Sequence, residues 1–308
     1  MLRHAKQHSI DSAIIYGFAV ISIVILSYSS RYIHKPVQNS VIIKNNTPVV
    51  EKPLFDTTVF KDISVYGKSY VVYDIVNKQV LAGKNEEVIL PLASITKVMM
   101  GVTARLHNKQ DTKIVISDQS IDGSYDLGLI KGQIWNLDEL LKYTLVFSSN
   151  DGSLAIADGL GGRKFFISQM NEDAEKLGLL LHFTHPAGLD ENHEVGGIGS
   201  ALSVAKLVSF ATRKFPDIFD ATTKKRVNVE ASNGRIIGIP NTNQEVSSLT
   251  GISMSKTGFT DKAGGNLVVV VDIAVGHPVA IVVLGSTHTE RFKDVDRLYK
   301  ALQKSILK

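Results

Sequence analysis

The sequence contains no cysteine among its 308 residues. Disulfides, thiol nucleophiles and cysteine-ligated zinc sites are therefore excluded. It also has little excess charge of either sign, because 34 lysines and arginines stand against 30 aspartates and glutamates, and it has no basic run interleaved with aromatic residues. Nucleic acid is therefore not an expected partner. No repeat or low-complexity tract occurs, and an apolar content of 44% supports one large core or two smaller ones.

The spacing of metal ligands is missing as well. His182, His185 and His193 are close together in the sequence, but no acidic residue stands where it would complete a metal site on a helix. We therefore expect neither a metal ion nor another cofactor.

Charged residues are absent from Ser12 to Ser30, a run of 19 residues. The run is long enough to cross a bilayer as a helix, and it lacks the polar stripe of a buried core helix. No small-x-small sequence follows it, which favours an uncleaved membrane anchor over a removed signal peptide. Residues 31–60 carry three prolines and no sustained period, so we interpret them as a linker. Basic residues flank the run on both sides and leave its orientation open.

Strand patterns occupy both ends of the remaining sequence. Residues 69–83 have β-branched and aromatic residues on either side of Asn77-Lys78, which predicts a β-hairpin. After Arg226, strand patterns return and include three in succession, over residues 251–259, 266–275 and 278–286. Three adjacent antiparallel strands are the simplest arrangement of these segments.

Helical spacing marks the middle and the end of the chain. Residues 138–147 and 165–177 carry apolar residues at helical intervals, and Gly178 is a candidate C-cap for the second segment. Thr287 and Glu290 have the spacing of a capping box, and an amphipathic pattern follows them. We expect this last helix to cover the sheet.

These patterns predict an α+β fold, with an antiparallel sheet flanked by helices. The sheet lobe would comprise about residues 61–93 and 226–308, and a helical lobe of about residues 94–225 would be inserted between them. A crevice between two lobes is a usual place for an active site.

Ser94 and Lys97 follow Pro91 near the expected start of a helix. Residues three apart on a helix share a face, so the two side chains can meet. A serine hydroxyl becomes a good nucleophile when a base takes its proton, and a lysine among cations and apolar walls can be that base. The pair is weak evidence alone, because serine and lysine occur at this spacing in many helices.

Two polar triplets follow further along the chain. Ser148–Asn150 stands at the end of an apolar helical run and offers a hydroxyl and a carboxamide, although it also fits an ordinary helix cap. Lys256–Gly258 lies in an expected strand. Its glycine permits close approach of a substrate backbone, and a strand edge can hydrogen-bond to that backbone. Alone, this triplet also fits a solvated lysine before a turn.

Together the three motifs resemble the SxxK, SxN and KTG signatures of penicillin-binding proteins and serine β-lactamases, in the same order. Segments such as PLASITKVMM, FSSNDGSLAIA, FTHPAGLD and KTGFTDKAGGNLV resemble the D-alanyl-D-alanine carboxypeptidase family from about Ser69 to the C-terminus. The resemblance implies a sheet domain with a helical domain and an acyl-enzyme mechanism. It also implies peptidoglycan stem peptides as substrates and β-lactams as covalent inhibitors.

The resemblance also implies roles for the motif residues. Ser94 would be the nucleophile, Lys97 its base, and Ser148 a proton relay towards the leaving group. Asn150 would hold the substrate amide.

The remaining motif residues would bind the substrate. Lys256 would set a positive field, Thr257 would bind the substrate carboxylate beside Gly258, and the N–H groups of Ser94 and Phe259 would form the oxyanion hole. Arg291 follows Lys256 by 35 positions, where family members place an arginine near the terminal carboxylate.

Two departures from related sequences bear on β-lactam turnover. Ser149 occupies the middle of the SxN triplet, where the family commonly has glycine or alanine and class A β-lactamases have aspartate. The helical lobe also lacks the ExxLN segment that supplies the deacylating glutamate of class A enzymes. We therefore expect slow release of β-lactams. A β-lactamase-like hydrolase and a catalytically silent peptidoglycan-binding scaffold stay as alternatives, and carboxypeptidase is not separated from endopeptidase.

The expected substrate orients the anchor. Because peptidoglycan lies outside the cytoplasmic membrane, we expect residues 1–11 in the cytoplasm and a single span at residues 12–30. The catalytic domain, residues 61–308, would then lie on the extracytoplasmic side of the cell membrane.

Overall fold

The computed structural model describes residues 55–121, 128–191 and 193–307. The expected membrane anchor at residues 12–30 and most of the expected linker lie outside these ranges, so both stay predictions. Within the described ranges, no helix combines the length and the apolar character needed to span a membrane.

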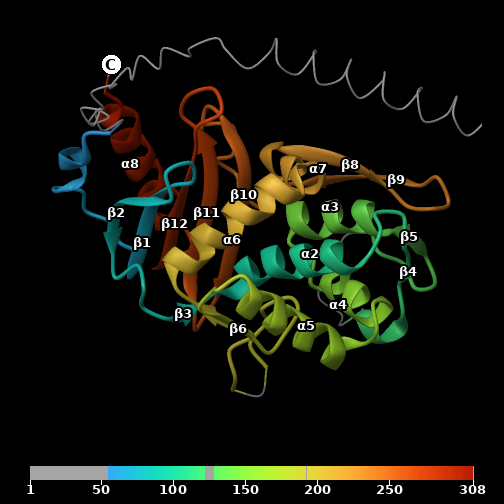
Figure 1. Cartoon of the computed structure of the whole chain (residues 1–308). Helices are drawn as coiled ribbons and strands as arrows, with labels where there is room; N and C mark the ends of the chain where they lie inside the picture. The colour runs from blue at the N-terminus through green and yellow to red at the C-terminus, as the bar shows by residue number, and fades with distance from the viewer. Residues whose placement is uncertain (1–54, 122–127, 192, 308) are drawn as a thin grey trace, which may run out of the picture. The chain divides into compact units, whose positions relative to one another are not determined.

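Five antiparallel strands form the main sheet in the order β10-β11-β12-β1-β2 (Figure 1). The expected N-terminal hairpin and C-terminal strands thus share one sheet, which joins where Val72 of β1 pairs with Ile281 of β12. Because β10 is an edge strand, one side of its backbone is open to a further strand. The strands span Ser69–Asp74 (β1), Gln79–Lys84 (β2), Ile252–Thr260 (β10), Gly264–Asp272 (β11) and Pro278–Ser286 (β12).

A helix covers each face of this sheet. α8, Glu290–Ser305, packs on the face that includes Val269. α6, Ala201–Lys214, packs on the opposite face, which includes Val268. Neighbouring residues of a strand point to opposite faces, so the unbroken valine run of β11 contributes to both cores.

The helical part of the molecule lies beside β10 and is centred on α2 (Figure 1). Val98, Met99 and Met100 of α2 are fully buried, so this helix is a core element rather than a surface one. Both expected helices, at residues 138–147 and 165–177, are confirmed by α3 and α5. The four main helices of this part span Thr96–His107 (α2), Leu137–Phe147 (α3), Asn150–Gly159 (α4) and Arg163–Lys176 (α5).

The expected helix ends are also present. Gly178 has a positive φ of 66°, and its N–H donates to the carbonyl of Glu175 just after α5, as in a glycine C-cap. At the start of α8, the N–H of Glu290 donates to the side-chain oxygen of Thr287 over 3.0 Å, which is half of the expected capping box.

Two segments pack differently from the division into lobes expected from the sequence. α6 belongs by position to the expected helical lobe, but it packs on β1 and β12. Among the described strands, β8 (Arg226–Glu230) and β9 (Ile236–Pro240) pair only with each other and pack on α3 rather than joining the main sheet. The reason is the position of their apolar side chains, since Val229 and Ile239 are buried in the core around the helices.

Short elements bring the edge strand and the helical part together. Turn η2, Ala93–Ile95, contacts β10 and leads directly into α2. Strand β3 just before it is held in a small sheet with β7 and β6. The remaining short elements are Leu90–Pro91 (β3), Lys113–Val115 (β4), Ile134–Asn136 (β5), Leu181–Phe183 (β6), Gly197–Gly199 (β7), Pro216–Phe219 (α7), Thr57–Phe60 (η1), Asp118–Ser120 (η3) and Asp220–Thr223 (η4).

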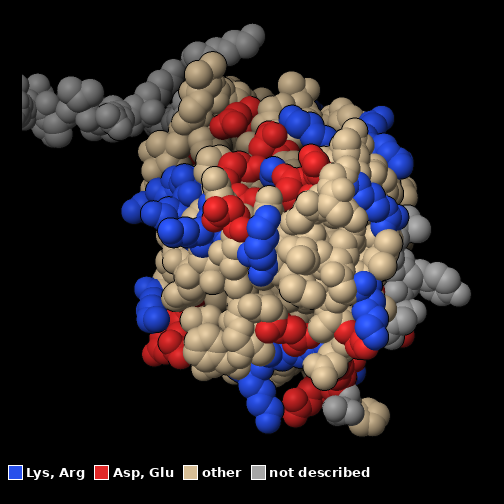
Figure 2. All heavy atoms as spheres, turned by 90° about the vertical axis from the view of Figure 1, so that its right-hand side faces the viewer, with Lys and Arg blue, Asp and Glu red and all other residues tan. Residues whose placement is uncertain are grey.

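Charge on the surface is mixed in sign. On the face turned to the viewer in Figure 2, lysine and arginine side chains lie in separate small groups, with acidic groups and wide uncharged areas between them. This face therefore provides no field of one sign to steer a charged polymer.

Candidate active site

Ser94 lies in turn η2, immediately before α2, and is half-buried. The preceding residue, Ala93, has a positive φ of 48°, a strained conformation for a residue with a side chain and one that is common beside catalytic groups. Lys97 occupies the first turn of α2, and its Nζ forms a hydrogen bond of 2.9 Å with Ser94 Oγ. The sequence prediction that these two side chains meet is confirmed.

The Lys97 amine is fully buried and well supplied with oxygen atoms. Besides Ser94 Oγ, it donates to Asn150 Oδ1 and to the carbonyl of Ala187, each over 2.9 Å. The two oxygen atoms of Asn150 and Ala187 can only accept, whereas the Ser94 hydroxyl can also donate. Ser94 is therefore the one of these three partners that has a proton to give.

A tight corner between two helices places the middle motif. α3 ends at Phe147, and Ser148 follows in the left-handed conformation, with φ 64° and ψ 33°. Ser149 then caps α4, since its Oγ accepts from the N–H of Gly152 over 2.7 Å. The triplet is therefore both a helix cap and part of the site. Ser149 caps α4, while Ser148 lines the cavity and Asn150 contacts Lys97.

This corner depends on a glycine that sequence reasoning missed. A Cβ atom at Gly152 would lie 2.3 Å from Thr144 Oγ1 and 2.9 Å from Ser149 Oγ. Any larger residue would push the start of α4 away from α3. The two-residue connection between the helices therefore requires glycine at this position.

Lys256 of β10 is the second buried lysine of the site, with 1% of its surface exposed. Its Nζ donates to Ser148 Oγ over 2.8 Å and to the carbonyl of Thr257 over 2.9 Å. Burial lowers the pKa of Lys256 well below its usual value, and the positive charges of Lys97 and Arg291 lower it further. Each of the two lysines thus contacts one serine hydroxyl.

Gly258 allows β10 to approach the turn that carries the nucleophile. A Cβ at this position would lie 2.8 Å from the carbonyl oxygen of Leu92 and 3.2 Å from the backbone nitrogen of Ser94. The edge of β10 therefore runs directly beside Ser94. Phe259, the next residue, is 45% exposed and packs edge-on against His288, with ring centroids 5.0 Å apart.

Arg291 and Thr257 lie beyond Lys256 on the cavity wall. Arg291 is 4% exposed, and its Nη1 donates to the carbonyl of Gly258 over 2.7 Å. Burial lowers the pKa of Arg291 to about 10, which leaves the guanidinium charged at neutral pH. The hydroxyl of Thr257 donates to Thr242 Oγ1 over 2.7 Å. Arg291 therefore both supports β10 and adds positive charge beside Thr257.

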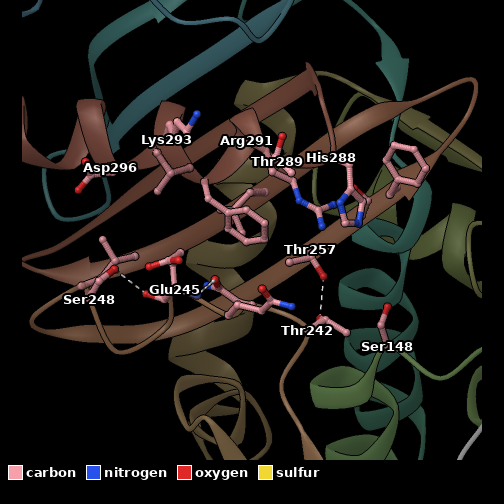
Figure 3. A pocket seen from close by; sticks show the side chains of 18 of the residues that line it. Ser148, Thr242, Glu245, Ser248, Thr257, His288, Thr289, Arg291, Lys293 and Asp296 are labelled. Carbon is pink, nitrogen blue, oxygen red and sulfur yellow. Dashed lines mark hydrogen bonds between the residues drawn. The ribbon is translucent and has the colours of Figure 1, made fainter.

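A cavity of about 790 Å³ unites most of the expected site (Figure 3). This volume lies within the range of roughly 300–1,000 Å³ that is typical of ligand pockets. Of the other three expected residues, Lys97 and Lys256 are hydrogen-bonded to the two serines, and Asn150 is hydrogen-bonded to Lys97. The expected residues that line the cavity are Ser94, Ser148, Thr257, Gly258, Phe259 and Arg291.

The loop between β6 and β7 contributes to the site in a way that the sequence did not predict. Its Ala187 supplies an acceptor to Lys97, and a Cβ at Gly188 would lie only 2.1 Å from the carbonyl oxygen of Ala93, so the loop packs against the nucleophile turn. His185 shapes this loop, because its Nδ1 accepts from the N–H of Ala187 over 3.1 Å and its Nε2 faces Glu191 Oε1 at 3.2 Å. The described residues hold no cluster of three or more His, Asp or Glu side chains suited to a metal ion.

The geometry agrees with the relatives of this chain. The sequence model of the D-alanyl-D-alanine carboxypeptidase family matches residues 56–288. A D-alanyl-D-alanine endopeptidase of Pseudomonas aeruginosa is 31% identical over 248 residues, which cover 76% of each chain. A D-alanyl-D-alanine carboxypeptidase of Mycobacterium tuberculosis is 28% identical over 200 residues, which cover 64% of this chain and 67% of that one.

A solved structure supports the same assignment. Penicillin-binding protein D2 of Listeria monocytogenes, in its cefotaxime-bound form, superposes with a TM-score of 0.68 at 25% identity. The match covers 78% of this chain and 98% of that one. The α+β fold expected from the sequence is thus the fold of the penicillin-binding proteins, and the chain belongs to the D-alanyl-D-alanine carboxypeptidase family of serine peptidases.

Proposed function

We propose that this DD-peptidase acylates Ser94 with peptidoglycan stem peptides and that the network of two lysines and two serines is its catalytic machinery. The proposal rests on two hydrogen bonds, Lys97 Nζ to Ser94 Oγ at 2.9 Å and Lys256 Nζ to Ser148 Oγ at 2.8 Å. Removing an ammonium group from water costs several kcal/mol, so two buried amines are a poor way to stabilise a fold. A catalytic role accounts for them, and a silent scaffold would have no use for both.

Acylation needs two proton transfers, one away from the attacking serine and one to the leaving nitrogen. Lys97 takes the proton of the Ser94 hydroxyl while Oγ attacks the carbonyl carbon of the scissile amide. The C–N bond then breaks, and the leaving nitrogen receives a proton through Ser148. Water finally hydrolyses the ester on Ser94, with Lys97 again as the base. The balance is one amide and one water consumed, and one acid and one amine released.

The hydrogen-bond partners of Lys97 favour a neutral amine before the attack. A neutral amine has two N–H bonds, which suit the acceptors Asn150 Oδ1 and Ala187 O, and one lone pair, which suits the Ser94 hydroxyl. One positive charge, on Lys256, would then serve the pair of lysines, because a neutral Lys97 does not lower the pKa of Lys256 as a charged Lys97 does. Two neighbouring buried charges would repel each other strongly, so a single shared charge costs less.

The oxyanion would form beside the edge of β10. A Cβ at Gly258 would lie only 3.2 Å from the backbone nitrogen of Ser94. In this proposal the N–H groups of Ser94 and Phe259 converge on one oxygen. Preorganised donors of this kind are the largest electrostatic contribution in many acyl-transfer enzymes. Thr257 of the same strand and Arg291 of α8 would bind the carboxylate of the leaving residue.

We also propose that β-lactams acylate Ser94. The strained amide of a β-lactam can be attacked by the Ser94 hydroxyl in the same way as the scissile amide of the peptide. The relative from Listeria was solved with cefotaxime bound. The sequence lacks the deacylating glutamate segment of class A enzymes, so we expect a long-lived adduct rather than rapid turnover.

The nucleophile assignment predicts a single site of covalent labelling. Incubation of the purified protein with a β-lactam should add one adduct mass to the peptide containing Ser94, and Ser94→Ala should abolish it. Ser232→Ala, which changes an exposed serine in a turn, is the matched control and should label fully. Peptide mass spectrometry measures the outcome, and equal labelling of Ser94→Ala would refute the mechanism.

The buried Lys256 amine predicts a conflict between activity and stability. Lys256→Met should lower kcat/KM by on the order of 10²-fold, since an electrostatic group at the transition state is lost. It should not lower the free energy of unfolding, because a buried cation is replaced by an apolar side chain of similar length. Lys109→Met, at an exposed loop position, should change neither quantity.

The lowered pKa of Lys256 also sets the sign of a pH effect. The folded protein releases this proton at a lower pH than the unfolded chain, whose lysines have a pKa near 10.4. At pH values between the folded-state pKa and the unfolded-state pKa, the unfolded chain binds more protons than the folded protein. The free energy of unfolding therefore rises with pH in this range. Denaturant unfolding from neutral to alkaline pH should show a steeper rise for wild type than for Lys256→Met. Parallel curves would show that Lys256 is not perturbed.

Arg291 should separate substrates by their terminal charge. A charge-assisted pair contributes roughly 1.5–3 kcal/mol, so Arg291→Ala should lower kcat/KM by about 10- to 150-fold for a substrate that ends in a free carboxylate. The loss should be small when that carboxylate is an amide. Arg297→Ala on the same helix is the control. Equal losses on acid and amide would mean that Arg291 acts only through its bond to Gly258.

We further propose that residues 12–30 anchor the chain in the cell membrane with the catalytic domain outside. The uncharged run and the location of peptidoglycan support this placement. An alkaline phosphatase fused after Lys308 should be active in cells. A green fluorescent protein fused at the same site should be dark, because it does not fluoresce when it is exported in unfolded form. The reverse pattern would place the domain in the cytoplasm and overturn the proposal.

A further inference from the structure

The loop between β6 and β7 contains a tight turn over residues 185–188. The carbonyl of His185 accepts from the N–H of Gly188 over 3.2 Å, with Pro186 at the second position, as in a β-turn. Gly188 has a positive φ of 75°, and a Cβ there would lie 2.1 Å from the carbonyl oxygen of Ala93. The turn therefore packs directly against the residue that precedes the nucleophile.

Ala187 in this turn makes one hydrogen bond within the loop and one to the catalytic site. Its N–H donates to His185 Nδ1 over 3.1 Å, and its carbonyl accepts from Lys97 Nζ over 2.9 Å. The N–H of Leu189 also donates to His185 Nδ1, over 3.4 Å. A shift of Ala187 that breaks its bond to His185 would therefore also move the acceptor of Lys97.

The two backbone N–H groups fix the tautomer of the His185 ring. A ring nitrogen that accepts hydrogen bonds carries no hydrogen, so in the neutral ring the hydrogen lies on Nε2. Nε2 lies 3.2 Å from Glu191 Oε1, and a neighbouring carboxylate favours a hydrogen on that nitrogen. His185 is only 5% exposed, so solvent water has little access to the ring.

Lys97 depends on the Ala187 carbonyl in the mechanism proposed above. A neutral Lys97 amine has two N–H bonds, which Asn150 Oδ1 and Ala187 O accept, and its lone pair then faces Ser94 Oγ. If Ala187 O moved away, an N–H bond of the amine could turn to Ser94 Oγ instead. The lone pair would then no longer face the proton that it must take.

We infer that His185 is a positioning residue for the transfer of the Ser94 proton to Lys97. Its unprotonated Nδ1 holds Ala187, and Ala187 holds the Lys97 amine with the lone pair directed at Ser94. His185 is not among the described residues that line the cavity, so it acts through Lys97 and not on the substrate. The inference rests on the proposed function and deepens it, because it adds a residue to the machinery of the same site.

Two substitutions separate the hydrogen-bond acceptor from the rest of the ring. His185→Leu removes the acceptor, whereas the amide oxygen in His185→Asn can accept from the N–H two residues further on, as in an Asx-turn. His185→Leu should lower the rate constant of Ser94 acylation at saturating β-lactam by about 10- to 100-fold, because a catalytic group is misplaced. His185→Asn should retain most of the wild-type rate.

Binding and chemistry should respond differently in these variants. The β-lactam concentration that gives half of the maximal acylation rate should stay unchanged, since His185 is not part of the described cavity wall. His182→Leu is the matched control, because His182 is an exposed histidine three positions earlier, in β6. It should be acylated at the wild-type rate. Stopped-flow kinetics measure both quantities, and thermal unfolding shows whether each variant is folded.

The tautomer can be measured in the wild-type protein. Nitrogen-15 NMR of the full-length chain, labelled at histidine, distinguishes a ring nitrogen that carries a hydrogen from one that does not. The signals of His185 are those that disappear in His185→Asn. At neutral pH they should show a hydrogen on Nε2 and none on Nδ1. A hydrogen on Nδ1 would overturn the inference, whether or not His185→Leu folds.

The other possible failures are distinguishable. A folded His185→Leu that is acylated at the wild-type rate, or a folded His185→Asn that loses about tenfold or more, would overturn the inference and leave the proposed function intact. If His185→Leu does not fold, the rate of His185→Asn decides together with the tautomer. If wild type is not acylated at Ser94, the proposed function is refuted, and this inference with it.

Discussion

Two lysine amines buried within one small cluster are the constraint on which the rest of the site depends. Burial lowers the pKa of Lys256, and a positive charge on Lys97 lowers it further. Each amine is nevertheless surrounded by oxygen atoms, including those of Ser94 and Ser148. A lowered pKa makes it easier for Lys256 to give up its proton, which suits a site where a serine must lose a proton and a leaving amine must gain one.

The fold keeps this cluster together with close backbone approaches rather than with ion pairs. Gly258 allows strand β10 to approach the Ser94 turn, and Gly152 allows α4 to follow α3 after a connection of only two residues. Both approaches leave no room for a side chain. The same edge strand places Thr257, Gly258 and Phe259 on the cavity wall, so the strand that aligns the catalytic groups also shapes the cavity.

The sequence predicted what is local and missed what is assembled at a distance. Contact between Ser94 and Lys97 follows from helical spacing, and the sheet order of the C-terminal strands follows from short turns. Ala187 could not be predicted, because a backbone carbonyl carries no residue signature. The position of α6 could not be predicted either, since an amphipathic pattern shows that one face is buried but not which element buries it. The segment 226–240 was assigned to the sheet for the same reason.

In the proposed mechanism the two buried lysines share one positive charge, and Ser94 donates its hydroxyl proton to a neutral Lys97. Neutron diffraction from a deuterium-exchanged crystal of the uncomplexed protein can decide this, since it locates the exchangeable hydrogens. We expect two deuterons on Lys97 Nζ, three on Lys256 Nζ, and the Ser94 deuteron directed at Lys97. Three deuterons on both lysines, with the Ser94 deuteron directed elsewhere, would overturn the mechanism.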